Sequence, residues 1–169
     1  MVRLVDDGLK LIEFDVNMLG IPQSDKQGQE VIVKWQLIDA GFSSNDSEFY
    51  TDSNGLEMQK RILNYRETFD LDTDMQVSSN YYPINSAIVV KSVKQDDSQI
   101  QMTVMNDRAQ GGSSLQPGAI ELMQNRRLFF DDNRGVEEPL NEVDAQTKQG
   151  IAVNEKYRVQ IFNSAKNKS

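Results

Sequence analysis

The feature that most limits how this chain can fold is a two-residue alternation of apolar and polar side chains along several short segments. From Ile12 to Met18, apolar side chains occupy every second position and acidic or amide side chains lie between them. Successive side chains of a β-strand point to opposite faces, so this period is typical of a strand with one buried face. The same alternation predicts strands at 31–37, 100–104 and 157–161, and a β-branched apolar run predicts another at 88–90.

Turn-forming residues separate these segments at a spacing typical of an antiparallel sandwich. The sharpest signal is Asn54-Gly55, because both residues tolerate a positive φ and can close a hairpin between 49–52 and 56–58. A helix over 56–65 remains an alternative, since its residues have good helical propensity. The sequence therefore predicts an all-β fold, an antiparallel β-sandwich, with one domain at 1–163, a loop at 144–150 and a disordered tail at 164–169.

Length and charge narrow the possible partners. The chain has 169 residues, which fits one domain, and 18 basic against 26 acidic residues give a net charge of −8. An acidic chain repels phosphate backbones, so nucleic acid is not an expected partner. The longest apolar runs are far shorter than the ~20 residues that cross a bilayer, so no membrane span is expected. The first residues lack the apolar core of a signal peptide, and any such signal would lie upstream.

The chain contains no histidine and no cysteine. Most hydrolytic metal sites and nucleophile relays need one of these residue types, which indicates part of an enzyme rather than a whole one. Asp70, Asp72 and Asp74 alternate as in the opening of a calcium loop, but Met75 and Tyr81 replace the required glycine and glutamate. A solvated strand face is the favoured interpretation, and no metal site is predicted in this chain.

Several polar groups between residues 106 and 139 resemble functional motifs. The segment Gly111-Gly112-Ser113-Ser114 lacks the lysine and following helix of a phosphate loop, and we interpret it as a turn. Asp131 and Asp132 are adjacent, so their carboxyls point apart and do not form a glycosidase pair. For Arg126 and Arg127, ion pairs across a sheet or with the acid-rich segment that follows are favoured over anion binding.

The aromatic residues divide into core and surface candidates. Trp35 lies in register with apolar strand positions, which favours the core over a sugar-stacking platform. Tyr81 and Tyr82 precede a proline and are predicted to be exposed on a loop, where sugar contact is a possible second role. Asn45 and Asn167 begin acceptor triplets for N-glycosylation, should the chain enter a secretory compartment.

Four motifs carry a family resemblance: Phe49-Tyr50-Thr51-Asp52-Ser53-Asn54-Gly55, Asn80-Tyr81-Tyr82-Pro83-Ile84-Asn85, Asn106-Asp107-Arg108-Ala109-Gln110-Gly111-Gly112-Ser113-Ser114, and Arg126-Arg127-Leu128 with Asp131-Asp132-Asn133-Arg134-Gly135. In this order and spacing they resemble class II α-mannosidases of glycoside hydrolase family 38, nearest to the lysosomal type. The resemblance covers about residues 2–142.

The resemblance implies a retaining enzyme that removes mannose from oligosaccharides with an aspartate nucleophile, a carboxylic acid partner and a zinc ion held by aspartate and histidine. None of those motifs occurs here. The resemblance therefore implies the C-terminal β-sandwich portion, of the supersandwich, galactose mutarotase-like kind, which packs on a catalytic domain outside this chain. It implies that zinc is bound in that other domain and that this chain contains no catalytic or metal-binding residues. It also implies that the protein is located in the lumen of the lysosome or vacuole.

One residue carries over as a substrate-binding candidate. In the family, a loop that matches 106–108 approaches the active site, so Arg108 is expected to help shape the sugar pocket. The leading hypothesis is thus a supporting fragment that is inactive alone. The alternatives are an independent carbohydrate-binding module and a purely structural or docking domain, for which a contiguous exposed apolar patch is the expected sign.

Overall fold

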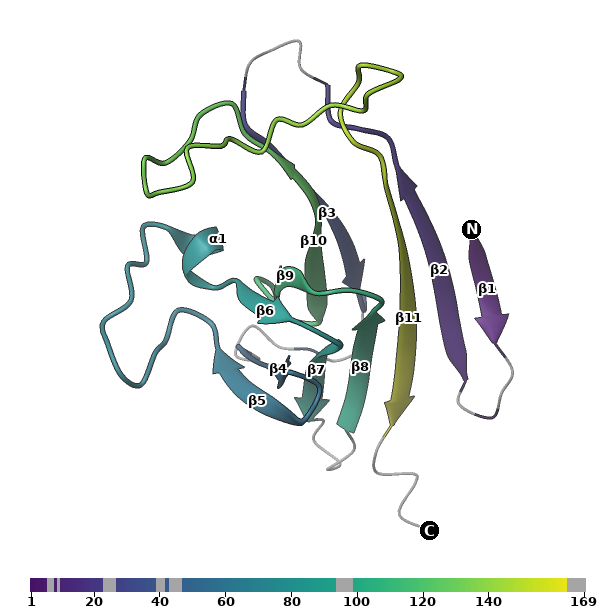
Figure 1. The fold of residues 1–169 in the computed structure, drawn as a ribbon. Helices are drawn as coiled ribbons and strands as arrows, with labels where there is room; N and C mark the ends of the chain where they lie inside the picture. The colour runs from purple at the N-terminus through teal and green to yellow at the C-terminus, as the bar shows by residue number, and fades with distance from the viewer. Residues whose placement is uncertain are drawn as a thin grey trace.

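A computed structural model shows two antiparallel β-sheets that face each other (Figure 1). It describes residues 1–5, 8, 10–22, 27–38, 42, 47–93 and 99–163. The predicted all-β antiparallel sandwich is confirmed. The predicted tail at 164–169 and both glycosylation asparagines, Asn45 and Asn167, lie outside the described residues. The domain limits remain a prediction.

The larger sheet has seven strands in the order β1-β2-β11-β8-β7-β4-β5. All neighbouring pairs are antiparallel. The C-terminal strand β11 lies between β2 and β8, and so joins the first strands to the middle of the sheet (Figure 1). The bounds are β1 Val2–Val5, β2 Leu11–Met18, β4 Glu48–Ser53, β5 Glu57–Ile62, β7 Ala87–Val93, β8 Gln99–Asn106 and β11 Val153–Asn163.

The smaller sheet has four strands in the order β3-β10-β9-β6. Its bounds are β3 Gln29–Gln36, β6 Tyr82–Ile84, β9 Gln110–Ser113 and β10 Ala119–Arg127. A one-turn helix, α1 (Gln76–Ser79), precedes β6. The chain passes from β8 in the larger sheet to β9 in the smaller one within three residues, so the loop between them lies at a junction of the two sheets.

The core fills the space between the two sheets. Trp35 of β3 is partly buried and packs edge-on against Tyr157 of β11, with ring centroids 4.8 Å apart, and against Phe14 of β2 at 6.1 Å. The predicted core position of Trp35 is confirmed. Other core side chains come from both sheets, namely Phe49, Tyr82, Ile84, Ile88, Val90, Met102, Val104, Ile120, Leu122 and Val159.

The predicted hairpin at Asn54-Gly55 is confirmed, and the alternative helix over 56–65 is wrong. The two residues have φ values of 52° and 73°, the left-handed region that Asn and Gly adopt most readily. Ser53 pairs with Glu57 across the hairpin, so its turn holds three residues and β5 begins one residue later than expected. The alternation of the flanking strands outweighed helical propensity.

The turn predicted for Gly111-Gly112-Ser113-Ser114 is wrong, because most of this segment belongs to β9. A Cβ atom on Gly112 would lie 2.5 Å from Leu122 Cδ2 and 2.9 Å from Ile84 Cγ1. Gly112 therefore serves the close approach of β9 to its neighbours rather than a change of chain direction.

The exposure predicted for Tyr81 and Tyr82 is also wrong. Tyr82 is buried and stacks edge-on with Phe49 at 5.6 Å, while Tyr81 is half-buried and donates its hydroxyl to Glu121 at 2.6 Å. The extended backbone that precedes Pro83 was expected to be a loop. Instead it pairs with β9 as strand β6, and the sandwich covers the ring of Tyr82.

The aspartate clusters lie in turns. Asp70, Asp72 and Asp74 belong to an irregular segment between β5 and α1, so the predicted strand face is wrong there; the Asp72 carboxylate accepts the N–H of Asp74 at 3.0 Å. Asp131 and Asp132 likewise accept N–H groups two residues ahead, each at 2.9 Å. These carboxylates organise their own turns.

The predicted ion pair across a sheet is confirmed for Arg126 and is wrong for Arg127, whose structural role uses backbone carbonyls instead. Arg126 forms an ion pair with Glu30 of the neighbouring strand β3 at 2.9 Å. Arg127 is buried and donates to backbone carbonyls, to Asn141 at 2.9 Å and Ile21 at 3.4 Å. Adjacent strand residues face opposite sides, so one arginine meets the surface and the other the interior.

Candidate functional site

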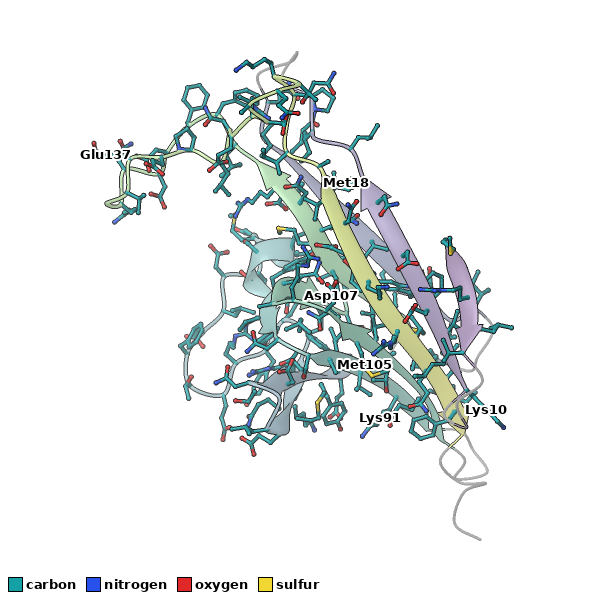
Figure 2. The ribbon with its side chains drawn as sticks, turned by 45° about the vertical axis from the view of Figure 1, so that its right-hand side comes forward. Lys10, Met18, Lys91, Met105, Asp107 and Glu137 are labelled. Atoms are coloured by element: carbon teal, nitrogen blue, oxygen red, sulfur yellow. The ribbon has the colours of Figure 1, made fainter. Side chains whose placement is uncertain are left out.

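The candidate Arg108 lies in the loop that leaves β8 and enters β9. The preceding residue, Asp107, lies beside β11 near the end of β8 (Figure 2). The Arg108 side chain is 49% exposed, so about half of its surface is available to another molecule. The loop is thus both accessible and placed where the two sheets meet.

Its guanidinium is held by two neighbours. Nε donates to Asp107 Oδ1 at 3.0 Å and Nη2 to Oδ2 at 3.2 Å, which is a forked ion pair. Nη2 also donates to the Asn154 carbonyl at 2.6 Å. The hydrogen bonds between Asp107 and Arg108 lower the pKa of the carboxyl and raise the pKa of the guanidinium. The arginine is therefore charged and oriented along the start of β11.

The backbone of the loop is anchored on two sides. Asn106 Nδ2 donates to the carbonyls of Ile84, at 2.9 Å, and of Arg108. On the other side, the backbone N–H of Lys156 donates to Asp107 Oδ2 at 3.2 Å. These contacts tie the loop to β6 and to β11, and so give it little independent freedom.

A buried polar cluster lies next to the loop. Gln110 Nε2 is 3.0 Å from the Met123 carbonyl, 3.0 Å from Glu155 Oε2 and 2.9 Å from the Tyr157 hydroxyl. The same Tyr157 hydroxyl donates to Glu155. Burial raises the pKa of Glu155, although the bonds from Tyr157 and Gln110 act against this, and burial also raises the pKa of Tyr157.

Sequence reasoning missed this cluster. A signal was present, because Glu155 shares a strand face with Tyr157 and Val159, both of which are buried. An acidic residue on an apolar strand face predicts a hydrogen-bonded partner inside the protein.

Asp52 supports the turn against which the loop packs. It is buried at the end of β4 and accepts four backbone N–H groups, from Gly55 and Asn85 at 2.8 Å, Ser86 at 2.9 Å and Ala87 at 3.2 Å. Burial pushes the pKa of Asp52 upward, but the four N–H groups outweigh it and lower the pKa. The loop that carries Arg108 hydrogen-bonds to the same turn, backbone to backbone, at 3.2 Å.

The described residues do not fit a catalytic zinc site. The whole sequence lacks histidine and cysteine. In the described part of the chain, no three acidic residues gather where they could hold a metal ion. A catalytic zinc needs three protein ligands of these types. Separately, none of the described helices is long and apolar enough to cross a membrane.

The fold and the loop together define a β-sandwich domain with a rigid arginine-bearing loop and no metal ligand set among its described residues. Residues 5–134 match the family described as the glycosyl hydrolases family 38 C-terminal domain, and the chain belongs to this family. The resemblance to class II α-mannosidases that the four motifs indicated is confirmed.

Individual relatives agree with this assignment. The chain is 44% identical over 141 residues to a lysosomal α-mannosidase of Mus musculus and 43% identical over 142 residues to that of Homo sapiens, which covers 83% and 84% of the chain. A probable α-mannosidase of Arabidopsis thaliana is 42% identical over 162 residues, or 95% of the chain. The chain spans only 13% to 15% of the length of these relatives.

Proposed function

We propose that this chain is the supporting β-sandwich of an α-mannosidase that releases terminal mannose from oligosaccharides. In this proposal the catalytic carboxylates and the zinc ion belong to a catalytic domain outside the chain. The chain packs on that domain, places the Arg108 loop at the rim of the mannose pocket, and is inactive alone. The names of the mammalian relatives support a location in the lysosome or vacuole lumen.

The observation that carries the proposal is the anchoring of the loop. Arg108 remains half exposed although its charge, its backbone and its neighbours are all fixed by hydrogen bonds. A group that is already ordered loses little conformational entropy when it contacts a ligand. This is what a residue that shapes a pocket needs.

Exposed apolar side chains support packing on a partner domain. The segment between β10 and β11 extends away from both sheets, with Glu137 at its far tip (Figures 1 and 2). On it, Phe130 and Val136 are 82% and 78% exposed, and with Leu128 and Leu140 they line one hollow of about 420 Å³. The same hollow is lined by charged side chains, namely Arg126, Asp131, Asp132, Arg134 and Glu138. Interfaces between domains of one chain combine apolar and polar surface in this way, and we assign this surface to the catalytic domain of the same protein.

The alternative of an independent carbohydrate-binding module loses its main support. Tyr82 is buried and Trp35 packs in the core, so neither presents a free ring face as a sugar platform. Tyr81 is half-buried, with its hydroxyl bound to Glu121, and lines a pocket beside α1. An NMR titration of the chain with mannose tests what remains. Shifts that saturate at millimolar mannose would favour the module, and unchanged resonances would exclude it.

Complementation tests the leading proposal. The chain is produced alone and together with the catalytic region of an α-mannosidase, and zinc-dependent hydrolysis of an α-mannoside is measured. We expect activity only in combination, and Arg108→Ala should raise KM in the combined protein. Arg3→Ala is the matched control, since Arg3 is also 49% exposed and ion-paired but lies on the edge strand β1. Hydrolysis by the chain alone, or equal effects of the two variants, would contradict the proposal.

A further inference from the structure

A second pocket lies at the edge of the larger sheet, on β5, the segment that follows it and β6. It has a volume of about 420 Å³ and shares no residue with the Arg108 site. Its walls include Lys60, Arg61, Arg66, Glu67 and Tyr82. The size falls in the range of pockets that hold small molecules, roughly 300 Å³ and above.

Two guanidinium groups share one aromatic ring in this pocket. The Arg61 Cζ lies 4.3 Å and the Arg66 Cζ 4.1 Å from the centroid of the Tyr82 ring. Arg61 also donates to the Thr51 hydroxyl at 3.0 Å, and Arg66 to the Ser79 carbonyl at 2.8 Å. These partners are neutral, so they fix the two side chains without neutralising them.

Among the described residues, no carboxylate lies within ion-pair distance of either guanidinium. Lys60, in the same wall, is paired with Glu48, and Glu67 makes no such contact with the two arginines. Burial lowers the pKa of both arginines, and the charge of Arg61 lowers that of Arg66 further. Two like charges in a partly desolvated pocket repel each other, and an anion bound in the pocket would reduce this repulsion.

Tyr82 positions the two arginines and offers no polar group of its own to the pocket. It is only 7% exposed, and its hydroxyl oxygen is buried, with no hydrogen-bond partner among the described residues. Its ring contacts both guanidiniums at the pocket wall.

We propose that this pocket binds an oxyanion, a phosphate, sulfate or carboxylate group, carried on a molecule about the size of a sugar. The two guanidiniums supply the charge and the hydrogen-bond donors, and the Tyr82 ring holds them at the pocket wall. Guanidinium forks match the geometry of such groups, and paired arginines are their common receptors. The proposal is independent of the mannosidase assignment.

NMR of the arginine Nε–H groups tests this in the whole chain. Inorganic phosphate and acetate are titrated separately at constant ionic strength, with chloride as the balancing anion. We expect saturable shifts of Arg61 and Arg66 at millimolar phosphate, and at least a tenfold weaker binding in Arg66→Gln. Arg3→Gln removes the same charge from an ion-paired arginine elsewhere and should leave the affinity unchanged.

The outcomes separate the ligand sources. Saturation by phosphate but not acetate identifies a phosphate-type ligand, and the reverse identifies a carboxylate. The proposal is overturned if neither anion produces saturable shifts, or if Arg66→Gln and Arg3→Gln weaken binding equally. Arg66→Lys keeps the positive charge and so separates the loss of charge from a loss of folding. It should bind the anion more tightly than Arg66→Gln.

Discussion

Replacing Asp52 with alanine should strongly destabilise the chain, because this buried carboxylate at the end of β4 joins two turns. The substitution leaves four backbone N–H groups without their carboxylate. A hydrogen bond to a charged group contributes roughly 1.5 kcal/mol or more, but water can reach part of the two turns once the carboxylate is gone. We therefore expect a loss of about 4 kcal/mol, and about 2 kcal/mol for Asp52→Asn, which still accepts with one oxygen.

Urea denaturation measures this loss through the fluorescence of Trp35, the single tryptophan, which lies between the sheets. With a urea m-value of about 2 kcal/mol/M, Asp52→Ala should lower the midpoint by about 2 M. Asp144→Ala is the control: this carboxylate also accepts two nearby N–H groups, from Gln146 and Thr147, but it ties no distant strands together. Equal effects of the two alanine variants would refute the reasoning.

The same aspartate sets a pH dependence. The folded-state pKa of Asp52 is below its ordinary value of 3.8, so its stabilisation is present above that pH and is lost as the pH falls through the folded pKa. Asp52→Asn should remove this acid-side loss, and an unchanged slope of stability against pH would contradict the assignment.

Three further predictions concern packing and burial. Gly112→Ala should cost about 2 kcal/mol, because the new methyl group overlaps side chains of β6 and β10, whereas Gly111→Ala meets only one tyrosine ring at 3.2 Å and should cost less. Arg127→Ala should cost about 3 kcal/mol, because it removes the donor to the buried Ile21 carbonyl and to the partly buried carbonyls of Asn141 and Glu142. The exposed ion pair of Arg126 should cost under about 1 kcal/mol when Arg126 is replaced by alanine, and both comparisons use urea midpoints. Burial raises the pKa of Glu155, so wild-type stability should fall as the pH rises above its ordinary value of 4.5, and Glu155→Gln should abolish that fall in a series of midpoints against pH.

Strand periodicity predicted most of the sandwich because it reports directly which face of a strand is buried. Val33, Trp35, Met102, Val104 and Val159 all lie in or against the core, as their alternation indicated. Pairing order could not be predicted in the same way. Nothing local in β11 shows that it separates β2 from β8, because strand order depends on contacts between distant parts of the chain.

The errors arose where a residue type has two uses. Glycine predicts a turn at Gly112, but here the missing side chain permits close packing of strands. The proline after Tyr82 predicts a loop, yet the extended backbone that proline enforces also suits the short strand β6. The local sequence does not distinguish the two uses of either residue, because the side chains that contact Gly112 and Tyr82 come from other strands.

The candidate site was only partly predictable for the same reason. Arg108 came from motif resemblance, whereas its supports at Asn154 and Lys156 are 46 and 49 residues from the groups they contact. Those partners reach the loop only because β11 pairs with β8. Without that register, no sequence pattern connects them to the arginine.

The Gln110 amide links the two layers of the sandwich. Through one nitrogen it bonds to Met123 in the smaller sheet and to Glu155 and Tyr157 in the larger. The Arg108 loop ends at this residue, so any change in the distance between the two sheets also changes the position of the loop. A substitution between the layers that changes this distance would move Arg108 without contacting it. It would impair any pocket that Arg108 borders, although every residue of the loop stays the same.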